Sequence, residues 1–314
     1  MLKNYLAIAI RNLVKYKFFN FINIAGLTVG ITCAILIGLY LRYELSYDKY
    51  NIDYDRIYRL ESHFNIHGND DKFAVTAFPL ARALQLEYPQ IESYTRFLSM
   101  DNNFFKHQEK NIFEENVYFA DSTVFDIFSW KFISGSAGKS LAEPNTMVLT
   151  RSLASRIFGN EDPMGEVLDT GYGFGFTITG VIEDIPGNSH LNFSALCSMI
   201  TLSNFYGVDN YNSLDSRFFW NVGFFSYIKL YENSEIQDIM EDFPRFYDKY
   251  MKALGDQFNA SFQLMVQPLA DVHLYSKVGH DLPRGNVAYI YIFGIVAIFL
   301  LVIASINYMN LATS

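Results

Sequence analysis

Charged residues are missing from two long stretches of this 314-residue chain. Residues 18–41 form an uncharged run of 24 residues, and residues 285–314 form one of 30 residues. An α-helix rises about 1.5 Å per residue, so 24 helical residues extend roughly 36 Å and can cross a hydrocarbon core of about 30 Å. Core helices of water-soluble domains are rarely this long and this apolar. The pattern therefore predicts transmembrane helices over residues 18–42 and 285–308.

The first apolar stretch is not typical of a cleaved secretory signal peptide. It follows a lead-in of 17 residues, and its 24 residues exceed the apolar region of roughly 7–15 residues that signal peptides carry. The stretch ends in Tyr40-Leu41-Arg42-Tyr43-Glu44, which has no small-residue cleavage pattern. We therefore interpret it as an uncleaved signal anchor.

The charges beside the two stretches predict how the chain is oriented. Residues 1–17 carry four basic residues and no acidic one, a net charge of +4. Residues 43–284 hold 19 basic and 33 acidic residues, a net charge of -14. Because positively charged flanks stay in the cytoplasm, we expect a multi-pass protein with a cytoplasmic N-terminus, an extracytoplasmic domain over 43–284 and a cytoplasmic segment that starts at 309–314. A chain this acidic is also a poor candidate for binding nucleic acid.

The first 17 residues have an amphipathic pattern. At about 100° per residue, their apolar side chains fall on one side of a helix and their basic ones on the other, and Ile8 interrupts the polar side. We expect a cytoplasmic helix over 1–17 that lies on the inner leaflet of the lipid bilayer; an unordered lead-in is the alternative.

Small residues recur at every fourth position of the first apolar stretch. They are Gly26, Gly30, Ala34 and Gly38. On a helix this spacing forms one stripe, and small side chains let a second helix approach closely. The stripe therefore predicts a helix-packing site.

Residues 43–284 show the patterns of a mixed α and β domain. Two β-α-β units, within about 50–115 and about 220–275, enclose a middle section over about 116–219. We therefore expect an α+β extracytoplasmic domain between two transmembrane helices, with one subdomain built from both ends of the segment and a second one inserted. The expected elements are strands over 56–65, 91–100, 222–230 and 260–268, a helix over 76–88, and a helix over 234–254 that is closed by Gly255.

The middle section has local signals of its own. Thr150 is a suitable N-cap for a short helix that ends at Phe158 and is closed by Gly159. Residues 161–165 then read as a turn, and residues 176–183 alternate as a strand.

One pattern imitates a phosphate-binding loop. Residues 135–140 read Gly-Ser-Ala-Gly-Lys-Ser, but Ile133 stands where that motif requires its first glycine. Pro144 also disfavours the helix whose N-terminus must receive the phosphates. We therefore expect no ATPase activity in this chain itself.

Other chemistry-bearing residues also favour structural roles. His63 and His67 have the spacing of metal ligands on a helix, but the local pattern is that of a strand that runs into a turn. Adjacent acids such as Glu114-Glu115 are more typical of a solvated surface than of a hydrolase site. We expect no enzyme, no catalytic residue, no cofactor and no metal.

Several stretches together resemble the permease subunits of MacB-type ABC transporters, which are also called FtsX-like permeases. The ordered set covers nearly the whole chain and is more specific than any single stretch. The similar stretches are Phe18–Leu27, Glu44–Asp48, Arg56–Arg59, Val148–Ala154, Phe158–Gly159, Asp162–Gly165, Thr179–Pro186, Asn188–His190, Gln267–Leu269, Asp271–Leu274 and Asn307–Thr313.

The resemblance implies a transport subunit of the bacterial inner membrane. In that family a separate cytoplasmic ABC ATP-binding subunit pairs with a dimer of permeases. ATP-driven dimer closure moves the spans and, through them, the outer domain, a process called mechanotransmission. Periplasmic adaptors and exported or extruded substrates are further partners. The resemblance also implies that the MacB-like periplasmic core domain at 43–284 has a porter-like part, matching the two end units, and an inserted sabre-like part, matching the middle section.

The chain departs from the family pattern in its number of spans. Family permeases have four, so the resemblance implies the N-terminal half of a permease, truncated after the second span. The alternative is a two-span membrane sensor or scaffold whose outer domain binds a ligand or a protein. An extracytoplasmic enzyme is a third and weaker hypothesis.

Overall fold

The computed structural model describes residues 15, 17–100, 103–170 and 173–313. The chain forms two compact units, Met1–Ser46 with Gly285–Ser314, and Tyr47–Arg284. The amphipathic helix expected over 1–17 lies almost wholly outside the described residues.

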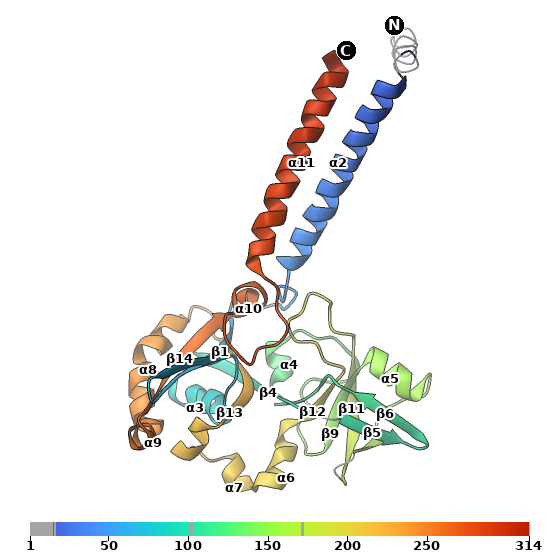
Figure 1. Ribbon diagram of the computed structural model, residues 1–314. Coiled ribbons are helices and arrows are strands. Elements are labelled where there is room, and N and C mark those ends of the chain that lie inside the picture. The colour runs from blue at the N-terminus through green and yellow to red at the C-terminus, as the bar shows by residue number, and fades with distance from the viewer. Residues whose placement is uncertain (1–14, 16, 101–102, 171–172, 314) are drawn as a thin grey trace. The chain divides into compact units, whose positions relative to one another are not determined.

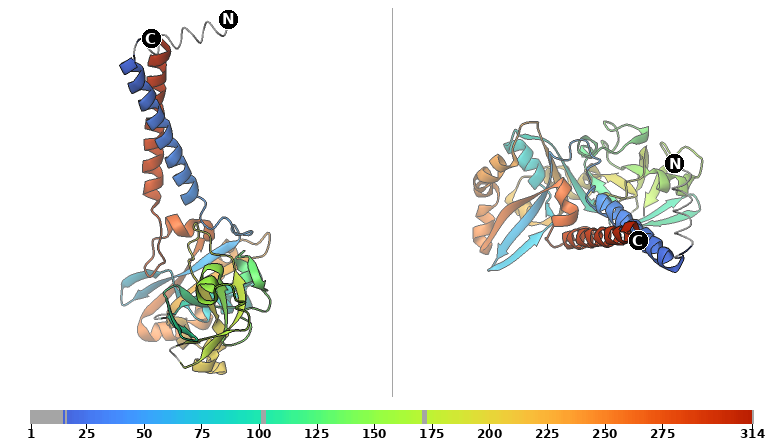
Figure 2. Two further views of the ribbon diagram at one scale, coloured as in Figure 1. Left: turned by 90° about the vertical axis from the view of Figure 1, so that its right-hand side faces the viewer. Right: turned by 90° about the horizontal axis from the view of Figure 1, so that it is seen from above.

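The first unit is a pair of long helices. They are α2 (Lys17–Glu44) and α11 (Val287–Thr313), which run antiparallel and side by side (Figures 1 and 2). Within them, Asn20–Glu44 and Val287–Met309 are long and apolar enough to cross a membrane. Their outer surfaces expose large apolar side chains such as Phe21, Ile35 and Ile298. In water such a surface is costly, so lipid or further helices must cover it.

Four long strands of Tyr47–Arg284 form an antiparallel sheet. They are β1 (Ile57–Ile66), β4 (Ile91–Ser99), β13 (Val222–Leu230) and β14 (Ala260–Pro268), in the spatial order β14-β1-β13-β4. Helix α3 (Leu80–Glu87) lies between β1 and β4 in the chain, and α8 (Ile236–Tyr250) with α9 (Lys252–Phe258) lies between β13 and β14. The two β-α-β units therefore interleave, so that the ends of the segment share one sheet.

The middle section extends the same sheet. Strands β7-β12-β9-β11-β10 of this section follow β4, and the pairs β7–β12 and β9–β11 are parallel. The hairpin β5–β6 comes from the end unit at about 50–115, but it pairs with β10 and ends the strand order. These strands are β5 (Asn103–His107), β6 (Lys110–Glu114), β7 (Val117–Ala120), β9 (Thr146–Thr150), β10 (Val167–Thr170), β11 (Gly175–Ile182) and β12 (Ala195–Ser198).

Shorter elements complete the domain. They are β2 (Asn69–Phe73), β3 (Thr76–Ala77), β8 (Phe132–Gly135), α4 (Val124–Ile127), α5 (Arg151–Phe158), α6 (Ser203–Tyr206), α7 (Val208–Tyr211) and α10 (Leu269–Tyr275), together with the 3-10 helices η1 (Met199–Leu202) and η2 (Ser216–Trp220). The expected α+β class is therefore confirmed.

Three apolar clusters stabilise the domain. One lies under the end units and contains Phe64, Leu84 and Phe243. A second lies within the middle section, and a third contains residues of both parts, such as Phe97 of β4 and Phe193 of the middle section. Because this third cluster and the continuous sheet join the two parts, Tyr47–Arg284 forms one unit.

Local capping signals predict the helix boundaries of the middle section better than those of the end units. Thr150 accepts a hydrogen bond from the backbone N–H of Leu153, and Gly159 closes α5 with a positive φ of 66°, as expected. The helix expected over 76–88 begins only at Leu80. Thr76 instead pairs with β13 and donates a hydrogen bond from its hydroxyl to Ser226 Oγ, 2.7 Å away.

The prediction of one helix over 234–254 is wrong at the C-terminal end of that helix. It breaks at Met251 and continues as α9 to Phe258, where Asn259 adopts the left-handed conformation and forms the C-cap. Gly255 lies inside α9 and does not end it. A Cβ at Gly255 would lie 2.7 Å from both the carbonyl oxygen of Ala260 and the hydroxyl of Tyr247. A close approach between α9 and its neighbours, rather than a helix end, therefore requires this glycine.

We predict that Gly255→Ala destabilises the domain by about 1–3 kcal/mol, because overpacking forces neighbouring atoms to shift. Thermal unfolding monitored by tryptophan fluorescence measures this, since both tryptophans, Trp130 and Trp220, belong to Tyr47–Arg284. The matched control is Gly138→Ala, where an added Cβ meets nothing within 4 Å. Equal stability of the two variants would contradict the steric explanation.

Candidate functional site

Small residues of α2 and α11 face each other in the helix pair. Gly30 is buried, and a Cβ added to it would lie 3.3 Å from the Cβ of Ala304 and 3.6 Å from the carbonyl oxygen of Leu300. Ala304 is itself buried. The two helix backbones therefore approach closely at this level, which only small side chains permit.

The four residues of the expected stripe have different surroundings. A Cβ at Gly26 would lie 2.7 Å from Nδ2 of Asn307, and Ala34 is half-buried. Gly38 is exposed, and a Cβ there would meet nothing within 4 Å. Because 3.6 residues make a turn, a four-residue spacing drifts around the helix by about 40° per step. The structure therefore brings Gly26 and Gly30 against α11 and leaves Gly38 away from it; the role of the stripe remains a prediction.

In Tyr47–Arg284, a buried arginine binds the segment that ends the domain. Arg59 of β1 is fully buried. Its Nη1 donates a hydrogen bond to Oδ1 of Asp281 at 2.7 Å, and its Nη2 donates to Oε1 of Glu61 at 2.5 Å and to Oγ of Ser276 at 2.9 Å. Asp281 stands three residues before Arg284, the last residue of this unit. A charge-assisted contact thus fixes the end of the domain to its sheet.

A second buried contact binds the segment that begins the domain. Asp48 is the second residue of the unit, and its Oδ2 lies 2.9 Å from Nδ1 of His190. The backbone N–H of His190 donates to the same carboxylate, and its Nε2 lies 2.7 Å from the hydroxyl of Tyr227 on β13. All three side chains are buried. His190 therefore links the start of the domain to strand β13.

The two contacts meet at one position of the sheet. Arg59 and Tyr227 are directly opposite each other on the antiparallel strands β1 and β13. Cross-strand partners share a face of the sheet and lie within side-chain contact. We call Asp48, Arg59, His190, Tyr227 and Asp281 the anchor cluster, because it holds both ends of the domain at one cross-strand pair.

Burial dominates the electrostatics around the anchor cluster. It raises the pKa of the Tyr227 hydroxyl far above its ordinary value. It also raises the pKa of Glu61, and the neighbouring Arg59 only partly offsets this effect. Burial alone would lower the pKa of Arg59, but Tyr227, Asp281 and Glu61 together keep it above its ordinary value. The guanidinium therefore stays charged inside the domain.

A smaller group of ion pairs lies beside the cluster. Lys229 of β13 places its Nζ 2.8 Å from Oδ2 of Asp53 and 3.2 Å from Oε1 of Glu92. Nη2 of Arg56 lies 2.8 Å from Oδ1 of Asp53. Lys229 first, and then Arg56, lower the pKa of Asp53. These contacts bind the first segment of the domain to β4 and β13 a second time.

The patterns that imitate catalytic motifs have structural roles. In the loop at 135–140, Gly135 has a φ of 84°, and a Cβ there would lie 2.4 Å from the carbonyl oxygen of Thr179. The next element after Ser140 is β9, so this loop has no helix N-terminus to bind phosphate. His63 lies on β1, with its ring nitrogens 3.1 Å from Gln263 Oε1 and 3.3 Å from Asp70 Oδ1. The structure contains no cluster of three metal-ligating side chains among its described residues.

Sequence patterns missed the anchor cluster because its members are far apart in the chain. A weak signal was present, since Asp48, Arg59 and His190 each stand inside a stretch that resembles the permease family. Arg59 and Glu61 of β1 are a further signal, because charged residues that lie in a buried strand need a partner. Tyr227 and Asp281 carried no such signal.

The family model of the MacB-like periplasmic core domain matches residues 20–245. The chain therefore belongs to this family, which confirms the resemblance. It contains the MacB-like periplasmic domain of an ABC-transporter-type permease family, between two helices of transmembrane length. No curated protein matches the chain.

Solved structures resemble this chain at low sequence identity. A domain of a putative permease protein from Porphyromonas gingivalis matches with a TM-score of 0.61 and 18% identity, over 75% of this chain and 94% of that one. The periplasmic region of MacB from Actinobacillus actinomycetemcomitans gives 0.43 and 16%, over 68% and 89%. The extracellular domain of the noncanonic ABC-type transporter YknZ from Gram-positive bacteria gives 0.41 and 11%, over 65% and 99%.

We predict that Gly30→Leu separates α2 from α11 by about 2 Å, because interaxial distances depend on the side chains at the contact. Electron paramagnetic resonance distances between spin labels at the exposed positions 35 and 299 measure the separation in nanodiscs, after Cys33 has been replaced. The matched control is Gly38→Leu, which should leave the distance unchanged. The same distance in both variants would refute a packing role for Gly30.

We predict that Arg59→Met destabilises the domain by about 3–5 kcal/mol, because it leaves buried carboxylates without a counter-charge. The matched control is Arg217→Met, which breaks an exposed pair with Asp215 and should change little. Chemical unfolding followed by tryptophan fluorescence compares the two. A small effect at Arg59 would mean that the buried pair contributes no more than a surface one.

Proposed function

We propose that this chain is a permease subunit that couples ATP hydrolysis by a separate cytoplasmic ABC ATP-binding subunit to movement of Tyr47–Arg284. The movement serves export or extrusion of a substrate outside the bacterial inner membrane. Family membership supports the permease class, and two long apolar helices support insertion in the bilayer. The net charge of +4 before the first helix and of -14 between the helices supports a cytoplasmic N-terminus and a periplasmic domain.

One observation carries the mechanical part of the proposal. The residues that begin and end the domain, through Asp48 and Asp281, are both bound by buried polar contacts to the cross-strand pair Arg59–Tyr227. The chain continues directly from these two segments into α2 and α11. A displacement of either helix end is therefore transmitted to β1 and β13 instead of being absorbed in a loose connection.

In this proposal, each part of the chain has a role that we assign from its position in the fold. The porter-like part comprises about 50–115 and 220–275, and the sabre-like part comprises about 116–219. The permease binds no nucleotide itself and works with a second permease copy. Gly26 and Gly30 pack α2 against α11, whereas Gly38, which points away from α11, is available to a helix of another copy. A periplasmic adaptor is a further expected partner.

Affinity purification of the native full-length protein tests the partner. We expect an ABC ATP-binding subunit to co-purify in stoichiometric amount, identified by mass spectrometry. In nanodiscs, a spin label at the exposed position 139 should report a distance between two permease copies that differs between the ATP-bound and ADP-bound complexes. A complex whose ATPase cannot bind ATP is the control.

Two results would contradict the proposal. A protein that never recruits an ATP-binding subunit would favour the two-span sensor. A complex that hydrolyses ATP while the distance stays constant would exclude mechanical coupling to the outer domain.

A further inference from the structure

The segment that ends the outer domain is held by two sets of contacts. We call residues 276–284 the strap. Its Asp281 belongs to the anchor cluster, which binds it to β1. The N–H of Gly279 donates a hydrogen bond to the carbonyl of Lys72 at 2.8 Å, and the carbonyl of Gly279 accepts one from the N–H of Ala74 at 2.9 Å. The strap therefore contacts both β1 and the end of β2 before the chain continues to α11.

An apolar cleft lies between the strap and the neighbouring strands. Its volume is about 460 Å³, within the range of roughly 300–1,000 Å³ that is typical of sites for small molecules. The lining residues are Phe73, Val75, Val222, Gly223 and Phe225 on the side of the strands, and His280 and Asp281 on the side of the strap. A molecule in this cleft would therefore touch the strands and the strap at once.

The glycine of the cleft leaves room beside the backbone of β13. A Cβ added to Gly223 would meet nothing within 4 Å. The pairing of β13 with β3 shifts its register at this position, between Val222 and Phe224. A glycine inside a strand is typical of such an irregularity and of places where a ligand approaches the backbone closely.

The histidine of the cleft has a strained backbone and a free ring. His280 has a φ of 47°, in the left-handed region. Such residues cost about 1–3 kcal/mol each, and they cluster at ligand clamps and switch regions. Its ring centroid lies 5.3 Å from that of Phe73, and its ring nitrogens form no hydrogen bond with any residue that the structure describes. They can therefore bind a polar group of a ligand.

The charges at the cleft favour a neutral ligand. Both carboxylate oxygens of Asp281 accept hydrogen bonds from Arg59, at 2.7 and 3.2 Å, and one of them also accepts from the hydroxyl of Ser276. Nη1 of Arg284 lies 3.6 Å from the same carboxylate. Because this charge is already neutralised, a charged ligand would lose its hydration without gaining a counter-ion.

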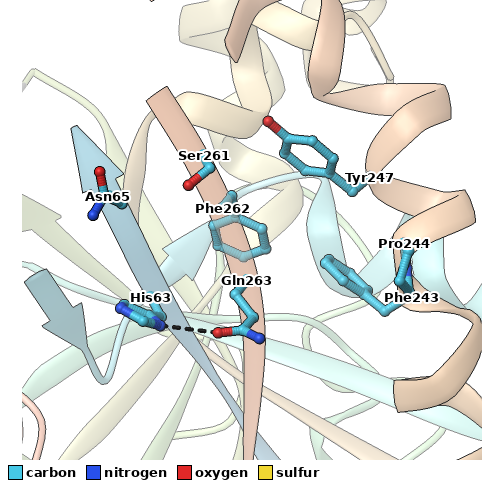
Figure 3. A pocket seen from close by; sticks show the side chains of 8 residues that line it. All are labelled: His63, Asn65, Phe243, Pro244, Tyr247, Ser261, Phe262 and Gln263. Atoms are coloured by element: carbon cyan, nitrogen blue, oxygen red, sulfur yellow. Dashed lines mark hydrogen bonds between the residues drawn. The ribbon is translucent and has the colours of Figure 1, made fainter. Parts of the chain in front are cut away.

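The groove beside β14 has different properties (Figure 3). Its volume is about 390 Å³, but its polar groups bind each other, since Oε1 of Gln263 lies 3.1 Å from a ring nitrogen of His63. None of its lining residues belongs to the strap. A ligand in that groove would therefore not contact the end of the domain.

We propose that the cleft binds a neutral, mainly apolar small molecule that carries one hydrogen-bonding group, and that this ligand holds the strap against the strands. Its apolar part contacts Phe73, Val222 and Phe225, and its polar group contacts His280. Binding then stabilises the attachment of the strap, and release of the strap weakens binding by the same factor. The site uses residues of Tyr47–Arg284 alone and does not depend on coupling to an ATPase.

Fluorine NMR with the full chain in nanodiscs, without nucleotide, tests the ligand class. The probe is 4-fluorobenzyl alcohol, and empty nanodiscs correct for partition into lipid. We expect saturable binding, and severalfold weaker binding of 4-fluorotoluene, which lacks the hydroxyl. The cation 4-fluorobenzylamine and the anion 4-fluorobenzoate should bind about tenfold more weakly or worse, because neither finds a counter-charge.

A protein variant that fills the cleft locates the site. Gly223→Leu places a side chain in the open space and should weaken probe binding about tenfold or more. The matched control is Gly138→Leu, because an added Cβ there also meets nothing within 4 Å and Gly138 does not line the cleft. The control should bind the probe like the wild type. Tryptophan-monitored unfolding verifies that both variants are folded.

Hydrogen–deuterium exchange measures the effect on the strap. Saturating probe should slow exchange of peptides from 276–284 at least threefold in the wild type, because the N–H of Gly279 is then released less often. It should not slow exchange in Gly223→Leu. Peptides from α6 and α7, which contain no lining residue of this cleft, are the internal control.

Four outcomes would overturn the proposal. They are the absence of saturable binding above that of empty nanodiscs, equal binding by Gly223→Leu, binding of a charged analogue as strong as that of the alcohol, and binding that leaves exchange of the strap unchanged. Because these experiments contain no ATPase and no nucleotide, their failure would leave the transport proposal unaffected.

Discussion

The fully buried charge of Arg59 constrains the rest of the outer domain. A guanidinium cannot leave water without counter-charges and hydrogen-bond acceptors, and Glu61, Ser276 and Asp281 supply them. Two of these residues come from the segment that precedes α11, so satisfying the arginine also positions the end of the domain. Replacement of Arg59 alone by an apolar side chain would leave Glu61 and Asp281 buried without a counter-charge and would release that segment.

The continuous sheet makes this fixation effective. The end units interleave as β14-β1-β13-β4, and the middle section extends from β4, so a force at β1 or β13 reaches every strand through backbone hydrogen bonds. The apolar cluster that contains residues of both parts also packs the inserted part against the end units.

Sequence patterns predicted the elements that depend on local chemistry. The uncharged stretches, the N-cap at Thr150 and the strands at 222–230 and 260–268 depend on nearby residues, and the structure contains all of them. Gly255 misled the prediction because its role depends on Ala260 and Tyr247, which a helix-end pattern does not include. The anchor cluster was not predicted because Asp48 and His190 are 142 positions apart and Arg59 and Asp281 are 222 apart.

If the domain moves as we propose, the place of the anchor cluster in the strand order makes the domain act as a lever. Both attachments lie at β1 and β13, near one end of the order, whereas β6 is eight strands beyond β13. At about 4.8 Å between neighbouring strands, β6 lies up to roughly 40 Å from the attachment. A rotation of about 10° about the Arg59–Tyr227 pair would therefore move β6 by as much as ~7 Å, while β14 would move by much less.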